Sequence, residues 1–129
     1  MNSLDKLFSD LKYEADALNE VSDELSKTIA QFEDRLNSLK LGVCAAVVLY
    51  DGDDRGERTY LCYQRFNGKW QLVVEDFNYL TEEVTDSRRL ADAPRRERVD
   101  SLDKFEGLLA AVLEESRNML KLVKDRCGA

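Results

Sequence analysis

The residues best suited to chemistry in this chain are five arginines that lie close together: Arg88, Arg89, Arg95, Arg96 and Arg98. Guanidinium groups bind phosphate and carboxylate groups through paired hydrogen bonds. Three of the arginines stand in or beside the first turn of a predicted helix, where unpaired backbone N–H groups also favour an anion. The cluster predicts either a site for a small anion or nucleotide phosphate, or a set of local ion pairs. We favour ion pairs because several acidic residues, from Glu82 to Asp100, lie nearby in the sequence.

The chain contains no histidine, and this excludes several kinds of active site. Nucleophile pairs with an imidazole, His-ligated zinc and histidine acid–base catalysis all require that residue. Cys44, Cys62 and Cys127 have no C-x-x-C spacing and no recognisable base nearby. The sequence also lacks the glycine-rich phosphate loops and the nucleophile elbow. We therefore expect a protein that is not an enzyme and that holds no cofactor.

One acidic loop resembles the start of a calcium-binding loop, with Asp51, Asp53 and Gly56 at the expected spacing. The fifth position is Arg55, a cation where an oxygen ligand belongs. The twelfth position is Cys62, where calcium loops carry a bidentate Glu. We therefore expect a solvated loop and no metal site.

The charge and hydropathy of the chain argue against nucleic acid and membranes as partners. The 19 basic and 26 acidic residues give a net charge of −7 at pH 7. A protein that binds the nucleic-acid backbone needs a basic face. The longest apolar run, Val43 to Tyr50, is much shorter than the roughly 20 residues of a membrane-spanning helix. The first residues show no signal peptide, so we expect a cytoplasmic protein.

Apolar residues follow a seven-residue repeat from Leu4 to Leu39, which predicts a helix over about 3–40. This segment contains no Gly or Pro, and Asn2 or Ser3 can cap its start. A stripe this regular is typical of helices that pack side by side. Its candidate interaction residues are Leu4, Phe8, Leu11, Leu18, Leu25, Ile29, Phe32 and Leu36.

Three strands are predicted next, over about 43–50, 58–66 and 69–76. The first is apolar on both faces, as in a strand that is central or covered on both sides. Asn67-Gly68 is the strongest short signal for a two-residue hairpin turn. This turn pairs Phe66 with Lys69. It places one set of apolar residues on the core face: Leu61, Tyr63, Trp70, Leu72 and Val74.

The last third of the chain predicts mainly helix. A short helix is predicted over about 86–92, and Pro94 fits the first turn of a long helix over about 94–126. The chain is therefore predicted to be a single α+β domain over residues 1–129. It consists of a long N-terminal helix, a three-stranded antiparallel β-meander and a long C-terminal helix that packs with the first.

The predicted N-terminal helix is too long for the sheet to cover. It extends about 55 Å, whereas a strand of eight or nine residues extends about 26–30 Å. The rest of its stripe needs cover from the last helix, a second copy or another partner. We therefore predict a non-enzymatic protein-interaction module (adaptor, chaperone or regulator) that acts as a homodimer. The alternative is an anion-binding protein that uses the Arg88–Arg98 cluster. Residues 4–39 kinked into separate pieces, or standing as a lone helix with their leucines in solvent, would overturn the association proposal.

The order and size of the predicted elements resemble those of YbaB-type nucleoid-associated proteins. The mass and acidity are similar to those of the acidic chaperones of type III secretion. Both resemblances concern shape and charge, and each implies a small cytosolic dimer. Neither assigns a function, because one fold hosts many functions.

Overall fold

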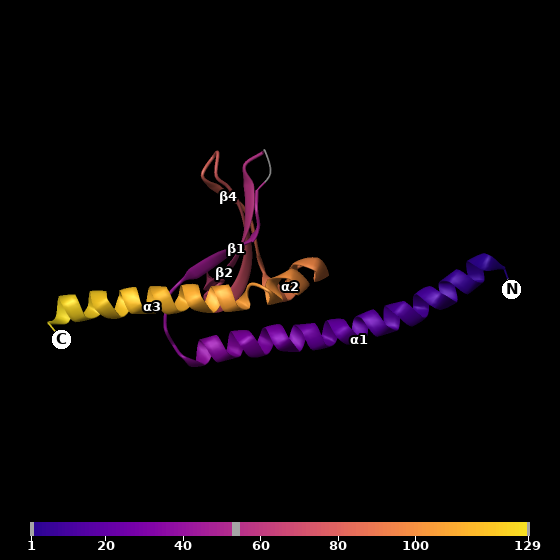
Figure 1. Ribbon diagram of the computed structural model, residues 1–129, viewed down its shortest axis with the longest axis horizontal. Helices are drawn as coiled ribbons and strands as arrows, with labels where there is room; N and C mark the ends of the chain where they lie inside the picture. Colours follow the sequence, from indigo (N-terminus) through magenta and orange to yellow (C-terminus); the bar gives the residue numbers. More distant parts are fainter. Residues whose placement is uncertain (1, 53–54, 129) are drawn as a thin grey trace.

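A computed structural model describes residues 2–52 and 55–128 of the chain. The elements follow the order α1, four strands, a short 3₁₀ turn, α2 and α3. The three helices lie together on one side of the sheet, and the end of the sheet at which β3 turns into β4 projects away from them (Figure 1). The chain is thus α+β, as predicted.

Helix α1, Ser3–Ser38, confirms the prediction from the seven-residue repeat. The Asn2 side chain accepts a hydrogen bond from the backbone N–H of Asp5 at 2.8 Å. This cap satisfies one of the unpaired N–H groups of the first turn. The helix ends before Lys40 and Gly42, which both have positive φ angles.

The sheet is an antiparallel meander of β1 (Ala45–Tyr50), β2 (Glu57–Phe66), β3 (Lys69–Asn78) and β4 (Glu83–Arg89), in that order. Asn67 and Gly68 both have positive φ, as a two-residue turn of this type requires. Phe66 pairs with Lys69 and Leu61 with Val74, which confirms the predicted register.

The prediction of three strands and of a helix over 86–92 is wrong. Residues 83–89 form β4, an edge strand that pairs antiparallel with β3. Only Leu90–Asp92 forms a helical turn, the 3₁₀ helix η1. β4 has mostly exposed, polar side chains and is held by backbone hydrogen bonds, so it carries no apolar alternation. Nothing in the hydropathy pattern distinguished it from a helix.

The first strand begins later than predicted, at Ala45 rather than at residue 43, and it lies at the sheet edge, as the predicted meander implies. Of the two settings expected for its apolar run, central or covered on both sides, the central one is wrong. Helix α3 packs across it, with Gly107 next to Val47. The continuous apolar run thus reflects cover by a helix, not a central position.

The predicted C-terminal helix is divided in two, α2 (Arg95–Leu102) and α3 (Phe105–Cys127). The turn between them allows Phe105 to stack on Phe32 of α1, with ring centroids 4.0 Å apart. α2 packs against α1, whereas α3 crosses β1 and β2. Packing of the C-terminal region on α1 is therefore confined to α2 and the start of α3.

The core lies between the helices and the predicted inner face of the β2–β3 hairpin. Leu61, Leu72 and Val74 are fully buried there, and Trp70 is partly buried against the same cluster. From α1 only the second half contributes, through Leu25, Ile29, Leu36 and the partly buried Phe32. The first half of α1 extends away from the core (Figure 1).

Candidate functional site

Arg88 is surrounded by carboxylates of its own chain. Its Nη1 lies 3.0 Å from Asp76 and 2.6 Å from Asp86, and its Nη2 lies 2.7 Å from Glu97. Burial alone would lower the pKa of Arg88, but the hydrogen bonds to Asp76, Glu97 and Asp86 raise it above its ordinary value. These contacts match the ion-pair interpretation of the cluster.

Arg96 and Asp100 form a second local pair on α2. Arg96 Nε donates to Asp100 at 3.1 Å, and the Tyr50 hydroxyl donates to the same carboxylate at 2.6 Å. The hydrogen bond from Tyr50, followed by that from Arg96, lowers the pKa of Asp100. Burial and the hydrogen bond to Asp100 raise the pKa of Tyr50 to about 12. Asp100 is thus an ionised acceptor that joins α2 to β1.

Arg95 and Arg98 lie on the same helix but have different surroundings. Arg98 donates to the Ala93 carbonyl at 3.1 Å and to Ser26 Oγ on α1 at 3.0 Å. Arg95 Nε is buried and has no hydrogen-bond partner among the described residues. The arginines of the predicted cluster thus differ in their surroundings: Arg88 and Arg96 form ion pairs, and Arg98 bonds to α1.

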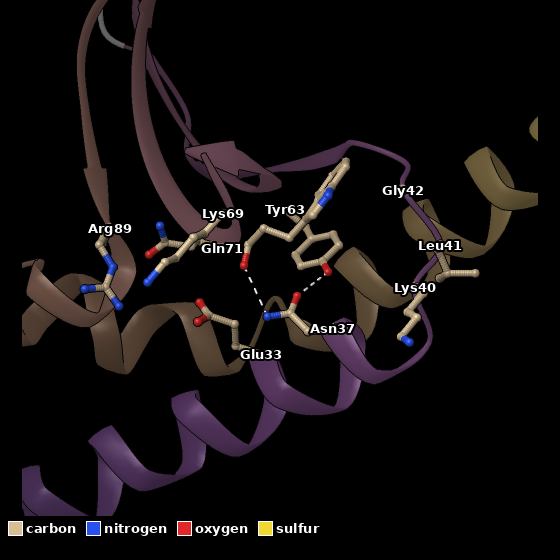
Figure 2. A pocket seen from close by; sticks show the side chains of 10 residues that line it. Glu33, Asn37, Lys40, Leu41, Gly42, Tyr63, Lys69, Gln71 and Arg89 are labelled. Atoms are coloured by element: carbon tan, nitrogen blue, oxygen red, sulfur yellow. Dashed lines mark hydrogen bonds between the residues drawn. The ribbon is translucent and has the colours of Figure 1, made fainter. Parts of the chain in front are cut away.

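Arg89 lies instead at an open hollow of about 670 Å³ between α1 and the β2–β3 hairpin (Figure 2). Lys40, Lys69 and Arg89 bring three positive charges to its lining, and Glu33 brings one negative charge. Arg89 also lies 3.8 Å from Asp92. The sequence analysis missed Lys40 and Lys69 because the three cations come from separate segments of the chain.

The wall of this hollow is held by hydrogen bonds between α1 and the hairpin. Asn37 donates to the Trp70 carbonyl at 3.2 Å and accepts from the Tyr63 hydroxyl, as Figure 2 shows. Glu33 accepts from the Leu72 N–H at 2.8 Å. Burial, followed by the charge of Glu33, raises the pKa of Tyr63. These groups are engaged in structure, Arg89 is paired with Asp92, and the side chains of Lys40 and Lys69 form no ion pair within the described residues.

The predicted interaction stripe on α1 divides into two halves. Leu25, Ile29 and Leu36 are buried, and Phe32 is half-buried against Phe105. The other four residues are exposed: Leu4 by 60%, Phe8 by 64%, Leu11 by 60% and Leu18 by 47%. The chain covers only the second half of its stripe, so any cover for the first half has to come from another molecule.

Helix α3 has a second uncovered apolar face. Leu108 and Val112 are buried against the rest of the chain, whereas a neighbouring stripe is exposed: Leu109, Leu113, Leu120 and Val123. At the start of this stripe, Leu109 joins Phe32, Leu36 and Leu39 in lining a groove of about 230 Å³. The groove connects the end of α1 to the exposed face of α3.

The cysteines and the acidic loop show no catalytic or metal-binding arrangement within residues 2–52 and 55–128. Burial raises the pKa of Cys62 to about 12, whereas Cys44 and Cys127 are exposed. No group of three His, Cys, Asp or Glu side chains in this part is placed to hold a metal ion. Asp51 pairs with Arg58 at 3.1 Å. Asp53, a ligand position of the calcium-like loop, lies outside the described residues.

Comparison with protein-family models, curated proteins and solved structures finds no match to this chain. No helix within the described ranges has the length and apolar character needed to cross a membrane.

Proposed function

We propose that this protein is a non-enzymatic protein-interaction module that acts as a homodimer. The observation that carries the proposal is the divided stripe on α1. The repeat that buries Leu25 and Ile29 continues through Leu11 and Leu18, which this chain leaves exposed. Burial of a leucine side chain stabilises by about 1.5–3 kcal/mol, so cover by another copy would be favourable. Adaptor, chaperone and regulator are the roles that such a module can serve.

The engagement of the polar side chains supports a non-enzymatic role. Arg88 and Arg96 form ion pairs with acidic side chains, and the Tyr63 hydroxyl donates a hydrogen bond to Asn37. The buried thiol of Cys62, with its raised pKa, is a poor nucleophile. Chemistry by an Asp or Glu alone would need a distinct pocket and a positioned partner.

The proposal is tested by sedimentation equilibrium of stripe variants. Phe8→Glu and Leu11→Glu place charges on the exposed half of the stripe, and we expect each to raise the dimer dissociation constant about tenfold or more. The matched control is Tyr13→Glu, because Tyr13 is 74% exposed and lies on the opposite side of α1 by helical spacing. Equal effects of stripe and control variants would contradict the proposal.

A second candidate function, binding of a small anion or nucleotide phosphate, is favoured by one observation. Three cations and one carboxylate line the hollow in Figure 2. The candidate residues are Arg89, Lys69 and Lys40, and only Arg89 belongs to the predicted arginine cluster.

Calorimetry with inorganic phosphate and with a nucleoside triphosphate tests this candidate. We expect Arg89→Ala combined with Lys69→Ala to abolish the binding heat. Arg96→Ala, which removes a cation outside the hollow, should preserve it. A wild-type chain that releases no heat with either anion would remove this candidate.

A further inference from the structure

The two uncovered apolar faces lie at opposite ends of the molecule. The first half of α1 extends beyond the sheet toward one end, and the second half of α3 extends toward the other (Figure 1). They therefore cannot cover each other within one chain. In a second copy with the opposite orientation, the exposed face of α3 lies at the end where the first copy has its exposed half of α1. Each exposed face can therefore contact the other kind of face on the second copy.

The two faces carry opposite charges. Residues 3–24 of α1 hold seven acids and two lysines, a net charge of −5. Residues 109–127 of α3, from the start of the exposed stripe to the end of the helix, hold four basic residues and three acids, a net charge of +1. Opposite potentials favour association and fix the orientation of the two surfaces.

The apolar stripes also have the same length. Leu4 to Leu18 on α1 and Leu109 to Val123 on α3 each extend over fourteen residue steps, about 21 Å in a helix. Both stripes repeat at steps of three and four residues or their sums, the spacing that lets two helices interdigitate. An antiparallel alignment sets Leu4 next to Val123 and Leu18 next to Leu109.

We infer that the first half of α1 of one copy docks antiparallel on the exposed stripe of α3, Leu109 to Val123, of a second copy. This inference rests on the proposed homodimer and names the surfaces that form it. α1 and α3 run in the same direction along the molecule (Figure 1), so a two-fold axis between the copies produces the antiparallel alignment twice. In this alignment the groove lined by Phe32, Leu36, Leu39 and Leu109 lies next to Leu18 of the incoming helix.

The alignment brings the start of α1 close to the end of α3 of the other copy, and a disulfide reports this contact directly. Cys127 is exposed at the end of α3. A second thiol is introduced by Ser3→Cys, with Cys44→Ser to remove the other exposed thiol. Under mild oxidation we expect a covalent dimer on a non-reducing gel. Mass spectrometry should link position 3 of one chain to Cys127 of the other.

Two controls use the same Cys44→Ser background. Lys27→Cys places an equally exposed thiol farther along α1, away from the predicted contact, and should not cross-link to Cys127. The Cys44→Ser parent, which keeps the buried Cys62 and the exposed Cys127, should also stay uncrosslinked, because the two-fold axis separates the C-termini. A dimer that links Cys127 to Cys127, or gives no linkage to position 3, overturns this inference and leaves the proposed homodimer in place. A monomer overturns both.

Charge reversal provides an independent test of the seam, the contact between the α1 stripe of one copy and the α3 stripe of the other. Arg117 and Lys124 flank the stripe on α3, and Asp5 and Glu14 flank the stripe on α1, by helical spacing. Reversal on one helix (Arg117→Glu with Lys124→Glu, or Asp5→Lys with Glu14→Lys) should weaken self-association about tenfold. A mixture of the two variants should form a heterodimer, because both of its seams regain opposite charges. Reversals that leave self-association unchanged would contradict the inferred seam.

Discussion

Arg88 links three segments of the chain through ion pairs. Its guanidinium group contacts Asp76 on β3, Asp86 on β4 and Glu97 on α2. Because most β4 side chains are polar and exposed, these ion pairs supply side-chain attachment for the edge strand. Arg88, one of the five arginines that predicted an anion site, therefore has a structural role.

We expect Arg88→Ala to lower the free energy of unfolding by about 1–3 kcal/mol, because it leaves Asp76 and Glu97 half-buried without their cation. The matched control is Arg96→Ala. The Arg96 side chain is 85% exposed, so the loss of its pair with Asp100 should cost about 0.5 kcal/mol or less. Urea denaturation of both variants measures the difference. Similar costs for the two variants would contradict the structural role of Arg88.

The buried thiol of Cys62 gives a pH-dependent prediction. Burial raises its pKa from 9.0 to about 12, so the folded state holds this proton more tightly than the unfolded state. The resulting stabilisation is complete below pH 9.0 and is lost as the pH rises toward about 12. At about pH 8, a disulfide reagent should therefore react with Cys44 and Cys127 in the folded protein. It should react with Cys62 only after denaturation. Rapid reaction of all three thiols would contradict the buried, protonated state.

At the scale of elements, the parts that were predicted correctly are those with strong local signals. The seven-residue repeat identifies α1 within two residues of its end, and Asn67-Gly68 gives the β2–β3 register residue by residue. β4 was missed because backbone pairing with β3 holds a strand whose side chains are polar. The turn between α2 and α3 was missed because apolar residues continue across it at helical spacing.

In the candidate sites, likewise, only contacts between residues that are close in sequence could be predicted. The ion pairs of Arg88 with Asp86 and of Arg96 with Asp100 join residues that are close in sequence, so a local argument could anticipate them. The hollow could not be anticipated, because Lys40, Lys69 and Arg89 meet only after α1 packs on the hairpin. Which half of the stripe the chain covers also depends on this packing.

Two leucines on the same position of the α1 repeat should respond differently to truncation. Leu25 is 8% exposed and Leu11 is 60% exposed. Leu25→Ala creates a cavity, and we expect it to lower the free energy of unfolding of the monomer by about 2–4 kcal/mol. Leu11→Ala should change that free energy by less than about 0.5 kcal/mol and should weaken association instead. Denaturation at low concentration and sedimentation at high concentration measure the two effects separately. A large loss of monomer stability in Leu11→Ala would contradict the exposed position of this half of α1.

At the scale of the whole molecule, the single chain combines a covered core with two uncovered helical faces. A helix over 4–39 that stood alone with its leucines in solvent would overturn association, but only the first half of α1 is exposed and the second half packs in the core. In the proposed dimer, a second copy covers the exposed leucines. The mass of the particle in solution therefore tests the dimer and the contact between α1 and α3 together.

The most direct test is size-exclusion chromatography with light scattering on the unmodified chain at high micromolar concentration. The proposed homodimer predicts a mass of twice 14.8 kDa, which falls toward the monomer mass on dilution or at high salt. A mass of 14.8 kDa at every concentration would contradict it.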